Sequence, residues 1–207
     1  MAKIRNPIRF SEYYEIDPAE LEDRGILDST LNADTKLFID PLLLESSNHN
    51  EISDSARSTY ETHFGTVIKF LAKSKSSSDV AWRSAARLLS FPEVKWTCLG
   101  YGSQSVSGSG SGADLTAQYI ETARQIVDLG IDDPDLFAAM ALFEEGVGPD
   151  RISDMTTNVI LGDLLKLNER ILSEIQVPTR ETTITLKNGQ TYTAELAANP
   201  YIGADDP

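Results

Sequence analysis

The sequence predicts a mainly helical α+β fold with one or two short N-terminal strands and a C-terminal β-hairpin. Apolar residues recur at helical spacing through much of residues 55–174, whereas β-forming residues alternate around an Asn-Gly pair near the C-terminus. The chain has 207 residues, 41% of them hydrophobic, and one cysteine, so it can bury a full core without disulfides. We therefore expect a mainly helical globular domain over residues 1–178 and a hairpin with an irregular tail over residues 179–207.

The N-terminal region predicts a short helix and a short strand. Asp17 can cap a helix that has Pro18 at its first position and ends at Gly25. The Leu-Phe-Ile triplet at residues 37–39 is typical of a buried strand, which would end at Asp40. The polar segment that follows, as far as Ser53, is expected to be a loop.

Two amphipathic helices are expected next. From about Ser55 to Ser74 the apolar residues lie three or four positions apart, which places them on one helical stripe. After a flexible connector, Ser78 or Asp79 can cap a second helix, which closes at Phe91-Pro92, and residues 94–99 can form a short strand. The stripe of the first helix contains Tyr60, Phe64, Val67, Ile68 and Leu71.

Residues 100–112 have the most unusual composition, because they are mainly glycine and serine. They predict a flexible loop that leads into a helix over about residues 113–129. The loop has no Gly-Lys-Ser/Thr of the kind that binds phosphate, so we interpret it as a linker or a lid. A further helix is expected to begin at residues 132–135, where acidic residues and a proline favour a helix start, and to end at Glu145.

The C-terminal part predicts one long helix and the hairpin. Ser153 or Asp154 can cap a helix that runs to about Glu174. Alternating β-formers on both sides of Asn188-Gly189 are the strongest short-range signal for a hairpin. Because an isolated two-stranded hairpin is marginally stable in water, we expect it to pack against the rest of the chain.

The net charge of −14 is unevenly distributed, since residues 101–207 carry 17 Asp and Glu but only 6 Lys and Arg. Such a field repels nucleic acid, so no direct nucleic-acid binding by this chain alone is expected. The acidity favours a basic partner or a cation instead. The sequence contains neither a signal peptide nor an apolar stretch long enough to span a membrane, which predicts a cytoplasmic protein without membrane contact.

The densest polar cluster follows Gly148 and contains Asp150, Arg151, Asp154 and Asn158. Asp154 and Asn158 are four positions apart, so they share one face of a helix. Carboxylate and amide oxygens suit Mg²⁺, and the cluster therefore predicts a metal-dependent hydrolase or nuclease. The same residues at the same spacing also suit a helix cap and an ion pair, and this structural interpretation stays open.

Asp40 is a second candidate metal ligand, together with Asp154, because strand-end carboxylates commonly bind metals in hydrolases. An Asp-Pro pair is also an ordinary start of a turn, which is the alternative interpretation. The two histidines, His49 and His63, are expected to have structural or solvent-exposed roles. Cys98 lies among apolar and aromatic neighbours and is expected to be a buried thiol.

The segments Thr35–Leu44 and Phe143–Leu161 resemble the N-terminal region of larger, poorly characterised bacterial proteins associated with anti-phage defence islands. The resemblance implies a bacterial immune component that acts with a partner subunit or a further domain, and it assigns no residue roles. We therefore expect an interaction or regulatory subunit of a defence complex, with a protein partner. The alternatives are the metal-dependent hydrolase and an acidic protein that imitates DNA.

Overall fold

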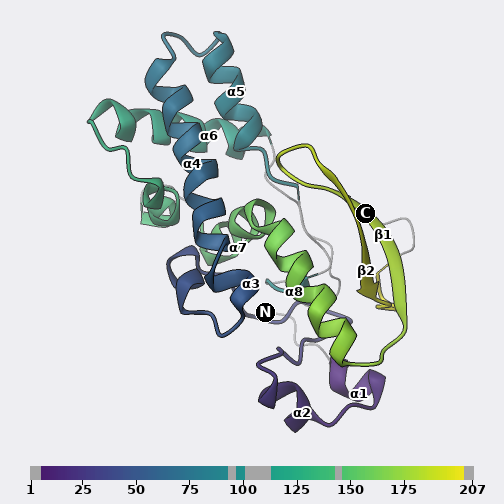
Figure 1. Ribbon diagram of the computed structural model, residues 1–207. Coiled ribbons are helices and arrows are strands. Elements are labelled where there is room, and N and C mark those ends of the chain that lie inside the picture. Colours follow the sequence, from purple (N-terminus) through teal and green to yellow (C-terminus); the bar gives the residue numbers. More distant parts are fainter. Residues whose placement is uncertain (1–5, 93–96, 101–112, 143–145, 203–207) are drawn as a thin grey trace.

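The computed structural model describes residues 6–92, 97–100, 113–142 and 146–202. Helices surround one central helix, and a two-stranded antiparallel sheet lies along one side of the molecule (Figure 1). The predicted α+β class is confirmed. The elements are α1 (Phe10–Tyr14), α2 (Pro18–Asp23), η1 (Pro41–Ser46, a 3-10 helix), α3 (Asn50–Ser53), α4 (Ala56–Lys73), α5 (Val80–Leu88), α6 (Ala113–Asp128), η3 (Pro134–Leu136) and η4 (Ala138–Leu142, both 3-10), α7 (Pro149–Val159), α8 (Leu161–Glu174), β1 (Thr179–Thr185) and β2 (Thr191–Ala197).

The core is built around α4, which contacts α3, α5, α6, α7, η1 and η3. All residues of its predicted apolar stripe are buried, as the helical spacing indicates. Phe64 has no exposed surface and stacks on Phe137, with their ring centroids 4.4 Å apart. The centroid of the Phe91 ring lies 6.3 Å from that of the Phe64 ring. This aromatic cluster joins the segment after α5 and the 3-10 helices to one face of α4.

The helix starts predicted from aspartate caps are confirmed for α2 and α5. The Asp17 side chain accepts a hydrogen bond from the backbone N–H of Ala19 at 3.0 Å. The Asp79 side chain accepts one from the N–H of Trp82 at 2.7 Å. Both contacts satisfy backbone donors that a helix start otherwise leaves unpaired.

The single helix expected from residue 132 to Glu145 is wrong, because this segment forms the two 3-10 helices η3 and η4. Phe137 and Met140 are three positions apart and both fully buried. A 3-10 helix places residues at this spacing on one face, so the tighter winding directs both side chains into the core. Residues 143–145, at the end of the expected helix, lie outside the described part of the chain.

The long helix expected from Ser153 or Asp154 to Glu174 is also wrong, because it consists of two helices that meet at Ile160. The first of these, α7, begins at Pro149, so neither Ser153 nor Asp154 caps it. The break coincides with a tertiary contact. Asp163, in the first turn of α8, is buried and accepts hydrogen bonds from hydroxyl groups of the chain at the start of α4. With α8 beginning as a separate helix, the Asp163 carboxylate lies within hydrogen-bond distance of those hydroxyls.

The strand expected at residues 37–39 is absent from the described structure, where pairing in this region is limited to isolated bridges. Thr35 pairs in parallel with Leu99, and the N–H of Thr35 donates to the carbonyl of Cys98 at 2.7 Å. Of the strand expected at 94–99, only this bridge is described. Most of the predicted glycine and serine loop, residues 101–112, lies outside the described residues and stays a prediction.

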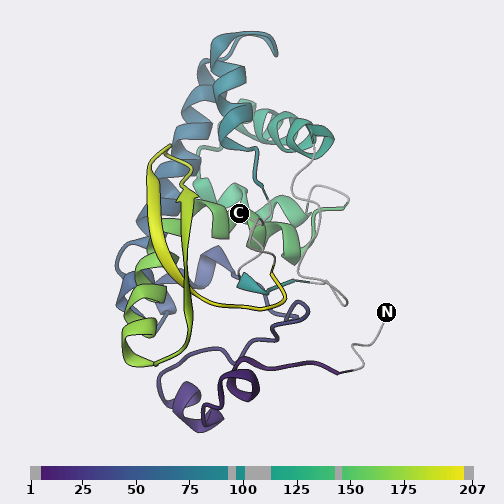
Figure 2. The ribbon, with the colours of Figure 1, turned by 90° about the vertical axis from the view of Figure 1, so that its right-hand side faces the viewer.

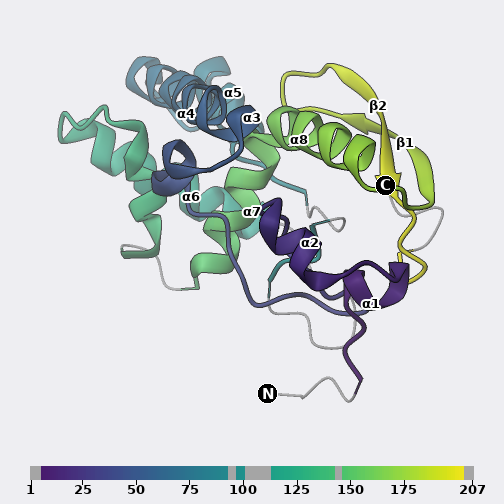
Figure 3. The ribbon, with the colours of Figure 1, turned by 60° about the horizontal axis from the view of Figure 1, so that its bottom comes forward.

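The hairpin is confirmed, with its turn at Asn188-Gly189 and Gly189 at a φ of 84°. It packs against α8, as expected for a sheet that is too small to be stable alone (Figure 3). Ile184 and Ala194 of the hairpin are buried against Leu161 and Leu165 of α8. The loop that was expected before Ser53 contains α3, so the helical content there is higher than predicted.

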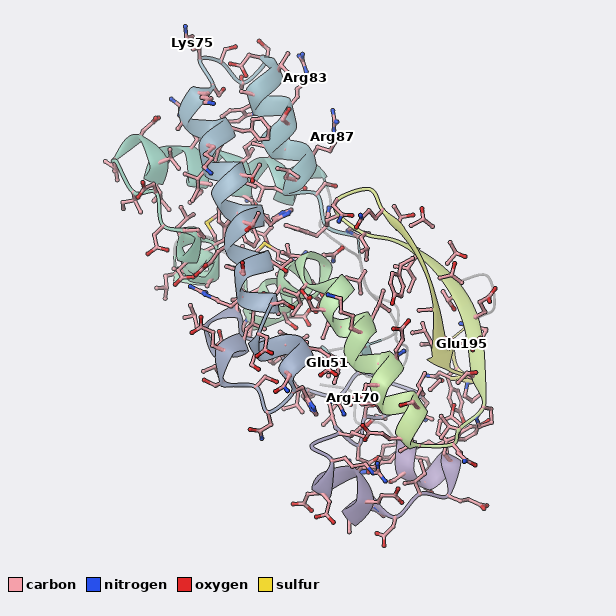
Figure 4. The ribbon with its side chains drawn as sticks, viewed as in Figure 1. Glu51, Lys75, Arg83, Arg87, Arg170 and Glu195 are labelled. Carbon is pink, nitrogen blue, oxygen red and sulfur yellow. The ribbon has the colours of Figure 1, made fainter. Side chains whose placement is uncertain are left out.

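Ion pairs attach the N-terminal segment to the far end of α8. In Figure 2, α1 and α2 lie at the foot of the molecule, beside that end. Arg24 of the segment pairs with Glu174 at 3.1 Å. Arg170, one turn before Glu174, pairs with Glu51 of α3 at 2.5 Å, and Figure 4 shows these two side chains side by side. None of the described helices is both long and apolar enough to cross a membrane.

Replacing Phe64 with Ala is expected to lower the free energy of unfolding by about 3–5 kcal/mol, because it opens a cavity at the centre of the aromatic cluster. Urea denaturation measures this change. Val80→Ala is the matched control, since the Val80 side chain is 70% exposed and its removal should change stability by no more than about 0.5 kcal/mol. Equal effects of the two substitutions would contradict the central position of Phe64.

His63 should make stability depend on pH, because burial lowers the pKa of its imidazole from 6.5 to about 4. The unfolded chain therefore takes up a proton between these two values while the folded chain does not, so stability is lost as the pH falls from 6.5 to 4. Compared with His63→Gln, the wild type should lose up to about 3 kcal/mol more over this interval. Denaturation curves at several pH values measure the difference, and parallel pH profiles would refute it.

Candidate functional site

The predicted polar cluster lies on α7, and part of it is engaged in packing. Asp150 and Arg151 are in the first turn, and Asp154 and Asn158 follow further along the same helix. Asn158 is buried, and its amide nitrogen donates to the carbonyls of Pro92 at 2.7 Å and of Asp154 at 2.9 Å. This side chain therefore ties α7 to the segment that follows α5.

Asp40 caps η1, since its carboxylate accepts a hydrogen bond from the N–H of Leu42 at 2.9 Å. The neighbouring N–H of Ile39 donates to the hydroxyl of Ser153 at 2.9 Å. The segments that carry Asp40 and Asp154 are thus in contact through Ile39 and Ser153, the residues that precede the two aspartates. Within the described ranges, no group of three or more His, Cys, Asp and Glu side chains could hold a metal ion.

A pair of carboxylates that sequence reasoning missed flanks Gly100. A β-carbon on Gly100 would lie 2.7 Å from Oδ1 of Asp150 and 3.2 Å from Oδ2 of Asp34. Burial raises the pKa of the Asp150 carboxyl, while Arg151 lowers it to a smaller extent. Nothing in the sequence connects Asp34 with Asp150, because the bridge from Thr35 to the segment around Cys98 creates their proximity.

A second feature stands out at the opposite end of the molecule, where α4, its connector and α5 form a helical hairpin (Figure 1). Residues 62–92 contain five basic side chains and one acidic side chain, in a chain with a net charge of −14. All five are exposed. We call this set the basic arm; it consists of Lys69, Lys73, Lys75, Arg83 and Arg87.

The acidic residue of this segment, Asp79, is engaged as the cap of α5. It accepts hydrogen bonds from the N–H groups of Trp82 and Lys75, both at 2.7 Å. These bonds, with that of Trp82 contributing most, lower the pKa of the Asp79 carboxyl to about 2. The carboxylate is therefore directed toward the backbone, and it forms no ion pair with the basic arm.

No member of the basic arm forms an ion pair with a described residue. By contrast, Arg57 pairs with Glu61 and Asp135, and Arg124 pairs with Asp128. Figure 4 shows Lys75, Arg83 and Arg87 directed away from the body at the end of the helical hairpin. Counting Lys, Arg, Asp and Glu over short segments of the sequence would have found this surface. The net charge of each half of the chain does not show it.

The chain belongs to a protein family described as a domain of unknown function, DUF8370, whose model matches residues 15–201. The match covers both the helical body and the hairpin. No curated protein and no solved structure matches the chain. The family therefore assigns no residue roles to this chain.

Gly100→Ala is expected to destabilise the fold by about 1–3 kcal/mol, because Gly100 has a φ of 133°, which other residues rarely adopt. The new methyl group would also contact Asp150. Gly130→Ala is the matched control: Gly130 has a φ of 85° but no atom within 4 Å of its β-carbon position, so the cost should stay near about 1 kcal/mol. Thermal denaturation compares the two, and equal losses would show that the carboxylate pair does not crowd Gly100.

Proposed function

We propose that this protein is a cytoplasmic interaction or regulatory subunit of a bacterial anti-phage defence complex, and that the basic arm docks on an acidic surface of a partner protein. The defence context rests on the resemblance of residues 35–44 and 143–161 to defence-associated proteins. The docking role rests on the five exposed cations that have no ion partner among the described residues, in a strongly acidic chain.

Charge complementarity favours a protein partner over nucleic acid. The arm is positive, so the remainder of the chain is more acidic than the total of −14 indicates. A nucleic acid long enough to pass the arm would meet this acidic body, whereas an acidic patch on a protein can be confined to the arm. At 0.1 M salt, screening limits the range of each charge's electrostatic interaction to about 10 Å. An acidic partner that contacts only the arm is therefore repelled weakly by the acidic body.

The arm also offers apolar contact area. Val80, at the first position of α5, is 70% exposed, and it lies between the two positively charged parts of the helical hairpin. Exposed ion pairs contribute at most about 1 kcal/mol each, so they set association rate and specificity more than affinity. An interface here would combine charged contacts at its rim with an apolar contact at Val80.

Neutralising the arm is expected to weaken binding to an acidic probe. We expect the triple variant K75Q/R83Q/R87Q to bind a fluorescent poly-glutamate peptide about tenfold more weakly than the wild type at low salt. The control R9Q/K36Q/R180Q changes the net charge equally outside the arm and should bind as the wild type does. Fluorescence anisotropy measures both. Equal weakening by the two variants, or tighter binding of an oligonucleotide than of the peptide, would contradict an arm that selects acidic protein.

The subunit role has a separate test. Native mass spectrometry of the chain co-expressed with the products of its neighbouring genes should detect a hetero-complex, which the arm variant weakens and the control variant does not. A monomer in the presence of all these products would refute the role.

A metal-dependent hydrolase is the competing proposal, with Mg²⁺ held by Asp150, Asp154 and Asn158, together with Asp40. The approach of the two candidate segments at Ile39 and Ser153 favours it. The structural contacts of Asn158 and Asp40 favour the interaction subunit instead, because both side chains already have backbone partners. Under the hydrolase proposal, calorimetry detects Mg²⁺ or Mn²⁺ binding that Asp154→Ala abolishes, and the absence of binding heat would end it.

The DNA-mimic alternative requires a surface row of unpaired acidic groups. Several acidic side chains are instead held by arginines: Glu20 and Glu174 by Arg24, and Glu51 by Arg170. The basic arm further interrupts the negative surface. These features favour the interaction subunit over the mimic.

A further inference from the structure

A cleft of about 580 Å³ lies between α4, the start of α8 and the turn of the hairpin. Its volume is within the range of small-molecule sites. Four separate parts of the chain line it, and most of the side chains they contribute are polar. The chemically active ones are Thr62, His63, Asp163, Lys166, Lys187 and Asn188.

The carboxylate of the cleft is already compensated. The Asp163 side chain is only 6% exposed, and it accepts hydrogen bonds from the hydroxyls of Ser55 at 2.8 Å and of Thr59 at 3.0 Å. Lys166 adds a third contact, with its Nζ 3.2 Å from Oδ1 of Asp163. Because three donors face this one negative charge, Asp163 has little attraction left for a cation. Lys166 itself is 58% exposed and keeps two further N–H donors.

Lys187, in the turn of the hairpin, supplies a second positive charge among the residues that line the cleft. Its ammonium group lies 4.6 Å from the centroid of the Phe91 ring and donates to the carbonyl of Ser90. These contacts hold the side chain in one orientation, and none of the described carboxylates forms an ion pair with it. Burial lowers the pKa of Lys187 to about 8, so the group is mostly protonated at neutral pH and loses its proton above pH 8.

His63 contributes a hydrogen-bond acceptor instead of a charge. Its Nε2 lies 3.2 Å from the carbonyl oxygen of Leu88, and a carbonyl can only accept, so Nε2 carries the proton. Nδ1 is then the unprotonated nitrogen. The low pKa of this buried ring, about 4, keeps it neutral at physiological pH.

We infer that this cleft binds a small molecule that carries an oxyanion group, with the anion between Lys166 and Lys187 and the apolar part against Leu88 and Leu186. The two lysines come from α8 and from the hairpin turn. Lys166 balances the charge of Asp163 and keeps free N–H donors, so the net positive charge of the three groups is that of Lys187. The end of β1 lies close to the start of α8, since a β-carbon on Gly162 would be 3.4 Å from Cδ1 of Leu186. The binding role is independent of the basic arm.

In the test, inorganic phosphate or acetate is added to the full chain at constant ionic strength. Binding is monitored by the NMR chemical shifts of the backbone amides. Phosphate should shift the amides of Gly162, Lys187 and Asn188 with saturation, and the double variant K166Q/K187Q should weaken this binding about tenfold or more. The double variant K69Q/K73Q removes two positive charges from the basic arm instead and should leave phosphate binding unchanged. Comparison of the two probes distinguishes a phosphate group from a carboxylate group as the preferred anion.

The pH dependence separates binding from a merely structural role of Lys187. In the wild type, affinity should fall as the pH rises through 8, because Lys187 loses its charge, while the imidazole of His63 stays neutral over this interval. Lys187→Arg keeps the charge and should bind on both sides of pH 8. Shifts at the basic arm instead of the cleft, equal weakening by K69Q/K73Q, or a phosphate response no larger than that of chloride would each overturn the proposal.

Discussion

The burial of one stripe of α4 is the constraint on which the other elements depend. Phe64 lies at its centre, stacked on Phe137 and close to Phe91, and neighbouring helices are placed by contact with this stripe. The remaining surfaces of α4 are consequently directed outward. Its threonine-bearing face lines the cleft, and its C-terminal end carries part of the basic arm. Packing and both proposed binding surfaces therefore share a single helix.

Elements that local sequence specifies were predicted correctly, and those that distant contacts specify were not. The spacing of apolar residues is sufficient for α4, and Asn188-Gly189 is sufficient for the hairpin turn. The break at Ile160 is different. It coincides with hydrogen bonds to the carboxylate of Asp163 from the hydroxyls of Ser55 and Thr59, which are far away in the chain. Tertiary hydrogen bonds of this kind leave no periodic signal.

The same distinction applies to the candidate sites. The sequence pattern located the polar residues of α7, but it could not show that Asn158 bonds to the carbonyl of Pro92 or that Asp150 and Asp34 both approach Gly100. Parts of the chain that are distant in sequence line the cleft around Lys166 and Lys187, so no local pattern predicts it. The basic arm is different, because its charges are close together in the sequence. Counting charges over a segment shorter than half the chain is sufficient to find it.

The position of the hairpin has a consequence for the order in which the fold is completed. β1 and β2 follow all described helices in the chain, yet they cover Leu161 and Leu165 of α8. During synthesis, when N-terminal parts emerge first, this face of α8 is exposed to solvent until the last strand has formed. The cleft also lacks Lys187 until then, because that lysine belongs to the turn between the strands. Formation of the hairpin, and not the assembly of the helical core, thus sets the moment at which the cleft exists.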